Sequence, residues 1–463
     1  MAGLPPNYVC NDLEFGRKVF RKISVRLIPL LVVCYVINYI DRINVSFAAL
    51  QMNRDLHFSA SVYGFGAGIF FLSYAACEVP ANLLLVRFGA RRWIARIMIS
   101  WGVFAGAMMF VKSPLQFYVL RFLLGVAEAG FFPGVIYYLT LWFPQGVRAR
   151  AISRFYVGIP IAGVLGASVS GLLLGLQGRA GLAGWQWLFL VEALPAIALG
   201  ILVLRILPDG PADAPWLSTE ERAWIAYRLQ QGSPAIAINS HAGLASAIRE
   251  PRAWLLGTFL LVTFAASYAY SFTAPLLIRD LTGFSNSAVG LIVAAIWFCV
   301  AVAVIANGIA ASNKNAPYLH ILVPALLISL GCMGVGLFRM PLLVISSLAL
   351  IPIFHNACFG PLYATAASFL EKDSAAGGLA LINTIGIVGG FLGPYYIGIA
   401  RDFTGSYQKG FLVLSVSCVF AVFLAFHLHR SEAARCSRQA RDDLSPKIAP
   451  HGAQPSELSP ADN

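Results

Sequence analysis

Long apolar runs and short polar segments alternate along most of the chain. The apolar runs are about 20 to 30 residues long, and apolar and polar positions do not alternate strictly within them. A helix that crosses the hydrocarbon core of a bilayer needs roughly 20 mostly apolar residues, and in lipid only helices or closed barrels satisfy their backbone groups. Because barrel strands would alternate, the pattern predicts an all-α membrane protein.

The apolar runs predict twelve transmembrane helices. Their ranges are about 25–47, 60–85, 93–112, 114–142, 151–176, 186–207, 253–277, 287–311, 317–338, 341–370, 377–400 and 409–429. No cleavable leader is expected, so the first run stays in the protein as a membrane span.

A long polar, Pro-rich stretch at 208–252 lies near the midpoint and divides the spans into two groups of six. Within it, Ser218 followed by Glu221 matches a capping box at the start of a short surface helix. The predicted domains are a cytoplasmic N-terminal segment, an N-terminal six-helix bundle, a cytoplasmic linker, a C-terminal six-helix bundle and a disordered cytoplasmic tail. Their boundaries are 1–22, 23–207, 208–252, 253–430 and 431–463.

A weak internal repeat supports two related halves. Glycines recur with spacings of three and then five in the fifth span of each half, at Gly163, Gly166 and Gly171 and at Gly390, Gly393 and Gly398. Small residues also recur wherever membrane helices pack closely, so the match is open to that simpler interpretation. Parallel halves occur in transporters, whose substrate sites lie near the bilayer midplane between the halves.

Composition agrees with this interpretation and limits the class of protein. Of 463 residues, 58% are apolar and 12% are charged, whereas soluble domains have about 25% charged residues. The net charge of +12 comes largely from loops on one side. Lysine and arginine mark cytoplasmic loops, so the excess indicates topology and not a nucleic-acid surface. We expect a monomer in the inner (plasma) membrane, with both termini cytoplasmic.

Motifs for catalysis, metals and nucleotides are missing from the sequence. The eight cysteines form neither a CxxC motif nor a Cys/His cluster, so we expect neither disulfides nor a metal site. There is also no Walker loop, HExxH motif or nucleophile elbow. We therefore expect no enzyme activity and no cofactor, and any energy for transport must come from an ion gradient.

Charged side chains inside the first span are the main candidates for function. The segment "NYIDRIN" at 38–44 interrupts an apolar run, and ionisable groups at bilayer depth usually face a bundle interior or a watery cavity. Helical spacing groups Tyr35, Tyr39 and Arg42 on one stripe, with Asp41 on a second stripe beside it. An arginine can hold a carboxylate through its planar fork of donors. A wet pair at a helix end is the alternative.

Two further spans carry acids. In span four, Arg121 and Glu128 are seven residues apart and share a face. Glu128 is a candidate proton carrier, or alternatively half of a permanent ion pair with Arg121 or Arg42. In span two, Tyr74 and Glu78 follow one stripe toward the cytoplasmic end, where Glu78 is a candidate gate or packing contact.

The remaining polar groups of the spans are weaker candidates for a functional role. We expect Glu192 to be structural and His355 to be satisfied locally. The second half has few charges, and side chains such as Tyr363 and Asn383 can hydrogen-bond to a substrate or stack on it but cannot carry protons at ordinary pH.

Several segments together resemble the major facilitator superfamily and, more narrowly, its anion:cation symporter family. They are "NYIDRINVSFA" at 38–48, "YAACEVPANLLLVRFGARRWIARIMISWG" at 74–102, "RFLLGVAEAGFFPGVIYYLTLWFP" at 121–144, "GWQWLFLVEALPAI" at 184–197 and "ALINTIGIVGGFLGPYYIG" at 380–398. The resemblance spans nearly all of 23–430. It implies import of a small organic anion, such as a sugar acid or tartrate, together with protons.

The resemblance also implies residue roles. Asp41 and Glu128 match the proton-coupling acids, and Arg42 matches the cation that faces the substrate. The expected substrate-binding residues are Arg42, Tyr39, Tyr35, Tyr74, Arg121, Tyr363 and Asn383. The expected gating residues are Glu78, Arg91 and Arg92.

The chain departs from the family pattern in three places. Ile387 replaces an asparagine of span eleven, Tyr363 stands near a usual tryptophan, and the loop between spans eight and nine has Lys314 but no acid. The missing asparagine puts one substrate hydrogen bond in question, and the missing acid puts the second-half latch in question. An organic-anion exchanger or exporter of the same fold, or a non-transporting membrane sensor, remains an alternative.

Overall fold

The computed structural model describes residues 12–231, 248–313, 318–369 and 375–444. Twelve helical stretches in these ranges are long and apolar enough to span a membrane. The predicted all-α class with twelve spans is therefore confirmed, and most span boundaries agree with the predicted ranges to within a few residues.

The described residues contain the following helices in chain order. They are α1 (Asp12–Ile43), α2 (Val45–Asp55), α3 (Ala60–Phe88), α4 (Ala90–Ala107), η2 (Met108–Phe110), α5 (Pro114–Glu128), α6 (Phe131–Thr140), α7 (Gln145–Tyr156), α8 (Gly158–Leu173), η3 (Leu174–Leu176), η4 (Arg179–Gly181), α9 (Gly184–Ile206), η5 (Pro211–Asp213), α10 (Thr219–Gln231), α12 (Pro251–Thr282), α13 (Asn286–Asn313), α14 (Leu319–Leu337), α15 (Pro341–Phe369), α16 (Ala375–Thr404) and α17 (Tyr407–Leu444).

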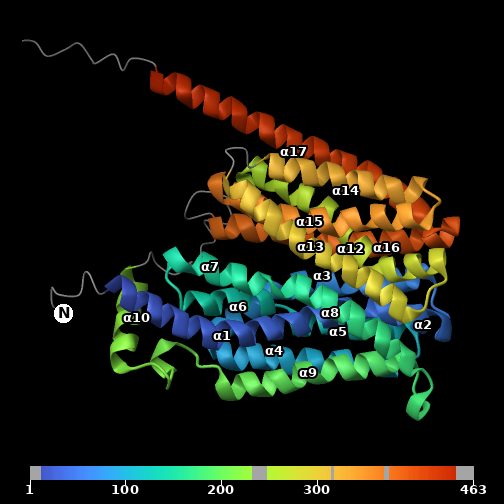
Figure 1. Ribbon diagram of the computed structural model, residues 1–463, viewed down its shortest axis with the longest axis horizontal. Helices are drawn as coiled ribbons and strands as arrows, with labels where there is room; N and C mark the ends of the chain where they lie inside the picture. Colours follow the sequence, from blue (N-terminus) through green and yellow to red (C-terminus); the bar gives the residue numbers. More distant parts are fainter. Residues whose placement is uncertain (1–11, 232–247, 314–317, 370–374, 445–463) are drawn as a thin grey trace, which may run out of the picture.

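The spans form two bundles that lie side by side (Figure 1). Helices α1 to α9 make the first bundle and α12 to α17 the second. The main contacts between the bundles join α3 to α16 and α8 to α13. The ribbons approach one another at the end where α2 lies, here called the α2 end, and separate toward the end where α10 lies, the α10 end (Figure 1).

Hydrogen bonds join the bundles at the α2 end. The backbone N–H groups of Ala60 and Ser61, at the start of α3, donate to the carboxylate of Asp402 on α16 at 3.0 and 2.9 Å. One turn further along α3, the Tyr63 hydroxyl donates to the Phe272 carbonyl of α12 at 2.8 Å. The α2 end is thus closed by polar contacts between the bundles as well as by helix packing.

The predicted glycine repeat corresponds to a structural repeat. In each triplet, the first and third glycines lie against a helix of the other bundle, α13 for α8 and α3 for α16. The middle glycine lies against the first span of its own bundle, α1 or α12. The two triplets therefore occupy matching positions in the two halves, which favours the repeat over chance recurrence of small residues.

Three features of the helices differ from the expectation. First, α1 begins at Asp12, well before the predicted span. Second, α17 continues to Leu444, whereas we expected disorder from 431 onward. The segment 431–444 is rich in alanine and arginine, which favour helix, and it contains neither glycine nor proline. Third, span four is broken into α5 and α6 at Ala129 and Gly130.

The predicted capping box of the linker is confirmed. The Ser218 Oγ accepts a hydrogen bond from the Glu221 N–H, and the Glu221 carboxylate accepts one from the Ser218 N–H. The same carboxylate binds Lys22 of α1 at 2.6 and 2.9 Å. Burial disfavours the charge of Glu221, but the hydrogen bonds from Lys22 and Ser218 outweigh it and lower its pKa. This contact docks α10 on α1.

Candidate functional site

An ion pair between Arg42 and Glu128 lies midway along the first bundle. The Arg42 Nε donates to Glu128 Oε1 at 2.9 Å, and the Arg42 Nη2 contacts the same oxygen. The other oxygen of Glu128 is buried and has no hydrogen-bond partner among the described residues. Of the two ion-pair alternatives raised for Glu128, the structure contains the one with Arg42.

The backbone changes direction directly after Glu128. Helix α5 ends at that residue, and Gly130 has a φ of +84° before α6 begins. An L-residue with a side chain rarely adopts this φ, so glycine suits the position. Broken helices near the midplane are a recurring feature of transporter sites, and here the break sets the Glu128 carboxylate at a helix end.

Aromatic rings from both bundles surround the ion pair. The Arg42 Cζ lies 5.4 Å from the ring centroid of Phe70 and 5.2 Å from that of Tyr74, both on α3. Tyr268 of α12 also lies close enough to Arg42 to interact with it. Tyr39 contacts Trp297 of α13 edge-to-face, with centroids 5.7 Å apart. The guanidinium is therefore at the interface between the bundles, among rings that can stack on a ligand.

Asp41 points into the first bundle and not toward the ion pair. Its Oδ2 accepts from Trp101 Nε1 of α4 at 2.9 Å, and its Oδ1 accepts from the Asn44 amide at 3.4 Å. The side chain is buried, which excludes a wet pair at a helix end. The two neighbouring stripes of α1 therefore face different surroundings, because adjacent residues of a helix point about 100° apart.

Arg121 is separate from Glu128. It is buried, and it donates to the Gly66 and Ala67 carbonyls of α3 at 3.2 and 3.0 Å. Its Cζ lies 4.9 Å from the Phe70 ring centroid. Arg121 thus links α5 to α3, and the Phe70 ring lies close to both Arg121 and Arg42.

Other predicted residues of the first bundle are more scattered. Tyr35 stacks on Phe155 inside the bundle, with centroids 4.5 Å apart. Glu78 is partly buried one turn beyond Tyr74 and lies within charge-interaction range of Arg42. Glu192, expected to be structural, accepts a hydrogen bond from Ser170 at 2.8 Å.

The predicted gating arginines lie at the α10 end. Arg91 contacts Asp209 through its backbone N–H at 2.9 Å and its side chain at 3.4 Å. Asp209 follows α9, so this contact stays within the first bundle. Arg92 is exposed. Lys314, on which the missing-latch interpretation rests, lies outside the described residues.

In the second bundle, the two predicted substrate-binding residues meet. The Tyr363 hydroxyl of α15 donates to the Asn383 side-chain oxygen of α16 at 3.2 Å. His355 is buried between Phe264 and Phe359, with each pair of ring centroids 5.1 Å apart. Within the described part of the chain its Nδ1 has no hydrogen-bond partner, so that atom does not form the expected local polar contact there.

Sequence reasoning did not single out three residues of the site. Trp101 and Phe70 have the apolar character of the spans around them, and Tyr268 is one of several polar residues in span seven. A tryptophan or tyrosine in a span adjacent to a buried acid or base is the only available signal. Which ring reaches the charge depends on how the helices pack.

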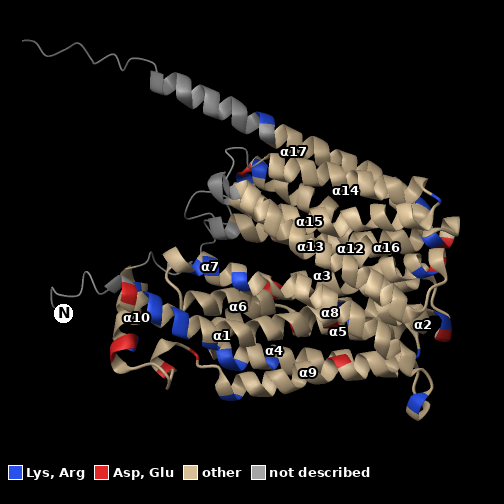
Figure 2. Cartoon of the chain, in the orientation of Figure 1, with Lys and Arg blue, Asp and Glu red and all other residues tan. Residues whose placement is uncertain are grey.

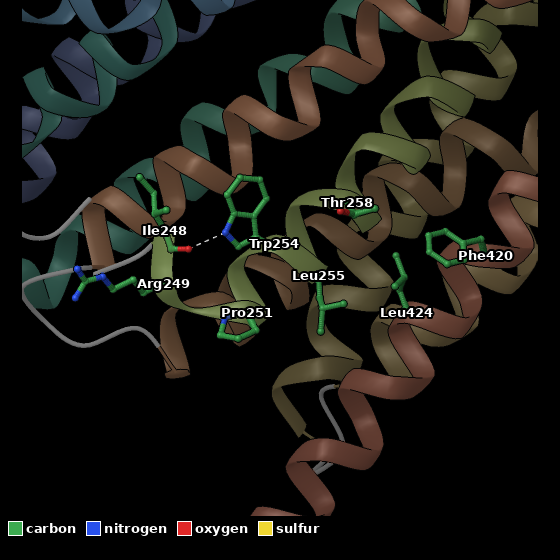
Figure 3. A pocket seen from close by; sticks show the side chains of 8 residues that line it. All are labelled: Ile248, Arg249, Pro251, Trp254, Leu255, Thr258, Phe420 and Leu424. Atoms are coloured by element: carbon green, nitrogen blue, oxygen red, sulfur yellow. Dashed lines mark hydrogen bonds between the residues drawn. The ribbon is translucent and has the colours of Figure 1, made fainter. Parts of the chain in front are cut away.

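Two pockets of the described surface lie away from the ion pair. One, of about 500 Å³, lies on the side of α12 and α17, lined by residues such as Trp254, Leu255 and Phe420 (Figure 3). Its lining is apolar except at Arg249 and Thr258, so it does not match the predicted carboxylate site. Many of the charged residues lie near the two ends of the bundles (Figure 2), and the Arg42–Glu128 pair belongs, with Asp41, Arg121 and Glu192, to the few charged groups away from the ends.

Two six-helix bundles with paired charges at their midpoint define a membrane transporter, which is not a class of enzyme. The profile of the Major Facilitator Superfamily matches residues 31–394. The chain belongs to this superfamily and is a multi-pass membrane protein, as the resemblance predicted.

Known proteins support the same conclusion. A protein of Agrobacterium vitis named "Putative tartrate transporter" is 40% identical over 91% of this chain and 93% of its own length. A protein of Acinetobacter baumannii named "Quinolone resistance transporter" is 35% identical over 89% of this chain and 95% of its own length. The solved structure of a bacterial homolog to the human lysosomal transporter Spinster has a TM-score of 0.72 at 16% identity. It covers 87% of this chain and 96% of that chain, a likeness of fold.

Proposed function

We propose that this transporter imports a small organic carboxylate together with protons by alternating access. The observation that carries the proposal is the Arg42–Glu128 pair, in which Glu128 is buried, Arg42 is mostly buried, and one carboxylate oxygen has no partner among the described residues. A cation at this depth needs an anion beside it, because an unpaired buried charge is costly. Either Glu128 or a substrate carboxylate can supply that anion.

The exchange of partners couples the two ligands. When Glu128 takes up a proton, it no longer neutralises Arg42, and the guanidinium binds a carboxylate more favourably. By linkage, the bound carboxylate raises the proton affinity of the site by the same free energy. Proton and substrate therefore stabilise each other's binding, and the loaded carrier moves both in one direction.

The other predicted residues take supporting roles. Asp41 is the second proton site, since it is buried one residue from Arg42. Tyr39 and Tyr74 contact the substrate from the first bundle, and Tyr363 and Asn383 contact it from the second. The binding role of Tyr35 and Arg121 and the gating role of Glu78, Arg91 and Arg92 stay predictions.

The basic loops support an orientation with the α10 end in the cytoplasm, in the inner membrane. Both termini are then cytoplasmic, and a closed α2 end corresponds to an inward-facing state. The bundles at 23–207 and 253–430 are the units that rock about the site.

Transport by acid variants tests the proposal. In pH-clamped proteoliposomes, we expect Asp41→Asn and Glu128→Gln each to lower proton-driven accumulation of the substrate at least tenfold while counterflow continues. The matched control is Glu220→Gln, which removes an exposed acid on α10 and leaves accumulation unchanged. A thermal-shift screen that compares tartrate with aromatic carboxylates first identifies a substrate. Full accumulation by both variants would rule out these acids as couplers.

An exporter of the same fold is the second candidate, favoured by the relative named for quinolone resistance. It predicts substrate-driven counterflow with no dependence on a pH gradient. The same vesicles distinguish the two, because only symport accumulates substrate when the outside alone is acidified.

A further inference from the structure

Four arginines meet in one pocket at the α10 end. The pocket has a volume of about 270 Å³ and lies between α1 and α7. Arg17 and Arg21 come from α1, and Arg150 and Arg154 come from α7. In each helix the two arginines are four residues apart, so they point to one side. Each of the two helices thus contributes two exposed arginines to the lining of the same small space.

None of these four arginines forms an ion pair with an acidic side chain in the described part of the chain. The neighbouring basic residues of α1 are different. Lys22 binds Glu221 at 2.6 Å, and Lys18 binds Glu14 at 2.9 Å. Arg26 lies over the Trp216 ring at 4.9 Å. On α1, the described acids thus form close ion pairs with Lys18 and Lys22, whereas Arg17 has only a longer-range interaction with Glu14. The four pocket arginines therefore remain able to bind an external anion.

The rest of the pocket lining is suited to an amphipathic ligand. Phe20, Phe143 and Val147 give apolar surface, and Ser24 gives a hydroxyl. One turn or less beyond the pocket, α1 exposes Val25 and the α7–α8 junction exposes Val157. Exposed apolar side chains of this kind belong in the hydrocarbon region, so the arginines lie at the depth where lipid headgroups lie.

We propose that this α1–α7 pocket binds the phosphate of an anionic phospholipid headgroup. Arginine forks match the oxygens of a phosphate, and basic pockets between membrane helices are known to hold anionic lipid headgroups. A soluble phosphate has the same chemistry but gains nothing from the apolar lining. The site is distinct from the Arg42–Glu128 pair and does not depend on the transport proposal.

Lipid binding to the full-length protein tests this assignment. The detergent-purified transporter is titrated with dioleoylphosphatidylglycerol, dioleoylphosphatidylcholine or inorganic phosphate, and binding is followed by native mass spectrometry and thermal shift. We expect tighter binding of phosphatidylglycerol than of phosphatidylcholine, weakened by salt. Arg150→Gln/Arg154→Gln should weaken phosphatidylglycerol binding by about 25-fold, from roughly fivefold for each arginine removed near an anionic surface.

Two further variants test whether lipid binding depends on this pocket and on its guanidinium groups. Lys18→Gln/Arg87→Gln removes the same charge at the same end outside the pocket and should leave the affinity near that of the unmodified protein. Arg150→Lys/Arg154→Lys preserves charge and fold while removing the forks, and should weaken binding by a smaller factor. Equal losses in the pocket and control variants would overturn the proposal, as would stabilisation by inorganic phosphate with none by phosphatidylglycerol.

Discussion

Two neighbouring side chains of α1 are held by different parts of the first bundle. Arg42 contacts Glu128 at the interface between the bundles, and Asp41 contacts Trp101 inside the first bundle. Under the proposed coupling, a proton on Glu128 would remove the anion that faces Arg42. A proton on Asp41 would have to act on Arg42 through the backbone of α1, because no described contact joins the Asp41 side chain to the guanidinium.

A charge-conserving change at Arg42 tests the importance of its fork. Lysine keeps the positive charge but offers a single ammonium in place of parallel donors. We expect Arg42→Lys to weaken the apparent affinity for the carboxylate about tenfold, equivalent to the loss of about 1.4 kcal/mol of binding free energy. Counterflow titration measures this affinity. Arg54→Lys, at an exposed site on α2, is the control, and an unchanged affinity in Arg42→Lys would contradict the role.

The sequence was informative about charges and less so about their partners. Arg42 and Glu128 stood out because charged residues are rare in apolar spans. The partner of Arg121 was unpredictable, since Arg121 binds carbonyl groups of α3 and backbone groups are present at every position. Tyr268 reaches Arg42 from the second bundle, and that contact depends on how the bundles pack.

At the scale of elements, the break between α5 and α6 is the feature that shapes the site. Gly130 has a left-handed backbone, and a Cβ added there would lie 2.7 Å from the Ala81 Cβ of α3. The break and the close approach of α3 both require glycine at this position.

We therefore expect Gly130→Ala to destabilise the protein by about 1 to 3 kcal/mol, the usual range for a strained backbone with a steric conflict. Thermal unfolding in detergent should show a lower midpoint. Gly146→Ala is the matched control, because a Cβ at Gly146 meets no atom within 4 Å. The same unfolding midpoint for both variants would show that the break tolerates a side chain.

The length of the apolar runs was enough to predict the spans, because each run must cross the same thickness of lipid. The break in span four was not predicted from Gly130 and Pro133, because glycine and proline are also tolerated within continuous membrane helices. The extension of α17 was not predicted, because a polar segment after the last span can be helical or disordered. The polarity of 431–444 favours disorder, whereas its alanines and arginines favour a helix.

At the scale of the whole molecule, a carboxylate of one bundle caps a helix of the other. Asp402 accepts two backbone N–H groups at the start of α3, where the helix dipole also favours negative charge. These bonds must break for the bundles to separate at the α2 end.

Asp402→Asn should shift the population toward a state open at the α2 end by about tenfold, since hydrogen bonds to a charged acceptor contribute about 1.5 to 3 kcal/mol. The measurement is thiol labelling of a cysteine introduced at Ala67, a buried position on α3. Asp280→Asn removes an acid of the second bundle that contacts Arg401 in the same bundle and serves as the control. Equal labelling of both variants would exclude Asp402 as a latch.

The close approach of backbones at the α2 end bears on the leakage of protons through the carrier. A Cβ added at Gly68 would lie 2.8 Å from the Phe391 carbonyl oxygen, and one added at Gly171 would lie 2.9 Å from that of Asn286. Backbones that approach this closely leave little room between them for a file of water molecules, along which protons hop quickly. Under the proposed proton symport, glycine at these positions would therefore help to keep protons from crossing without substrate.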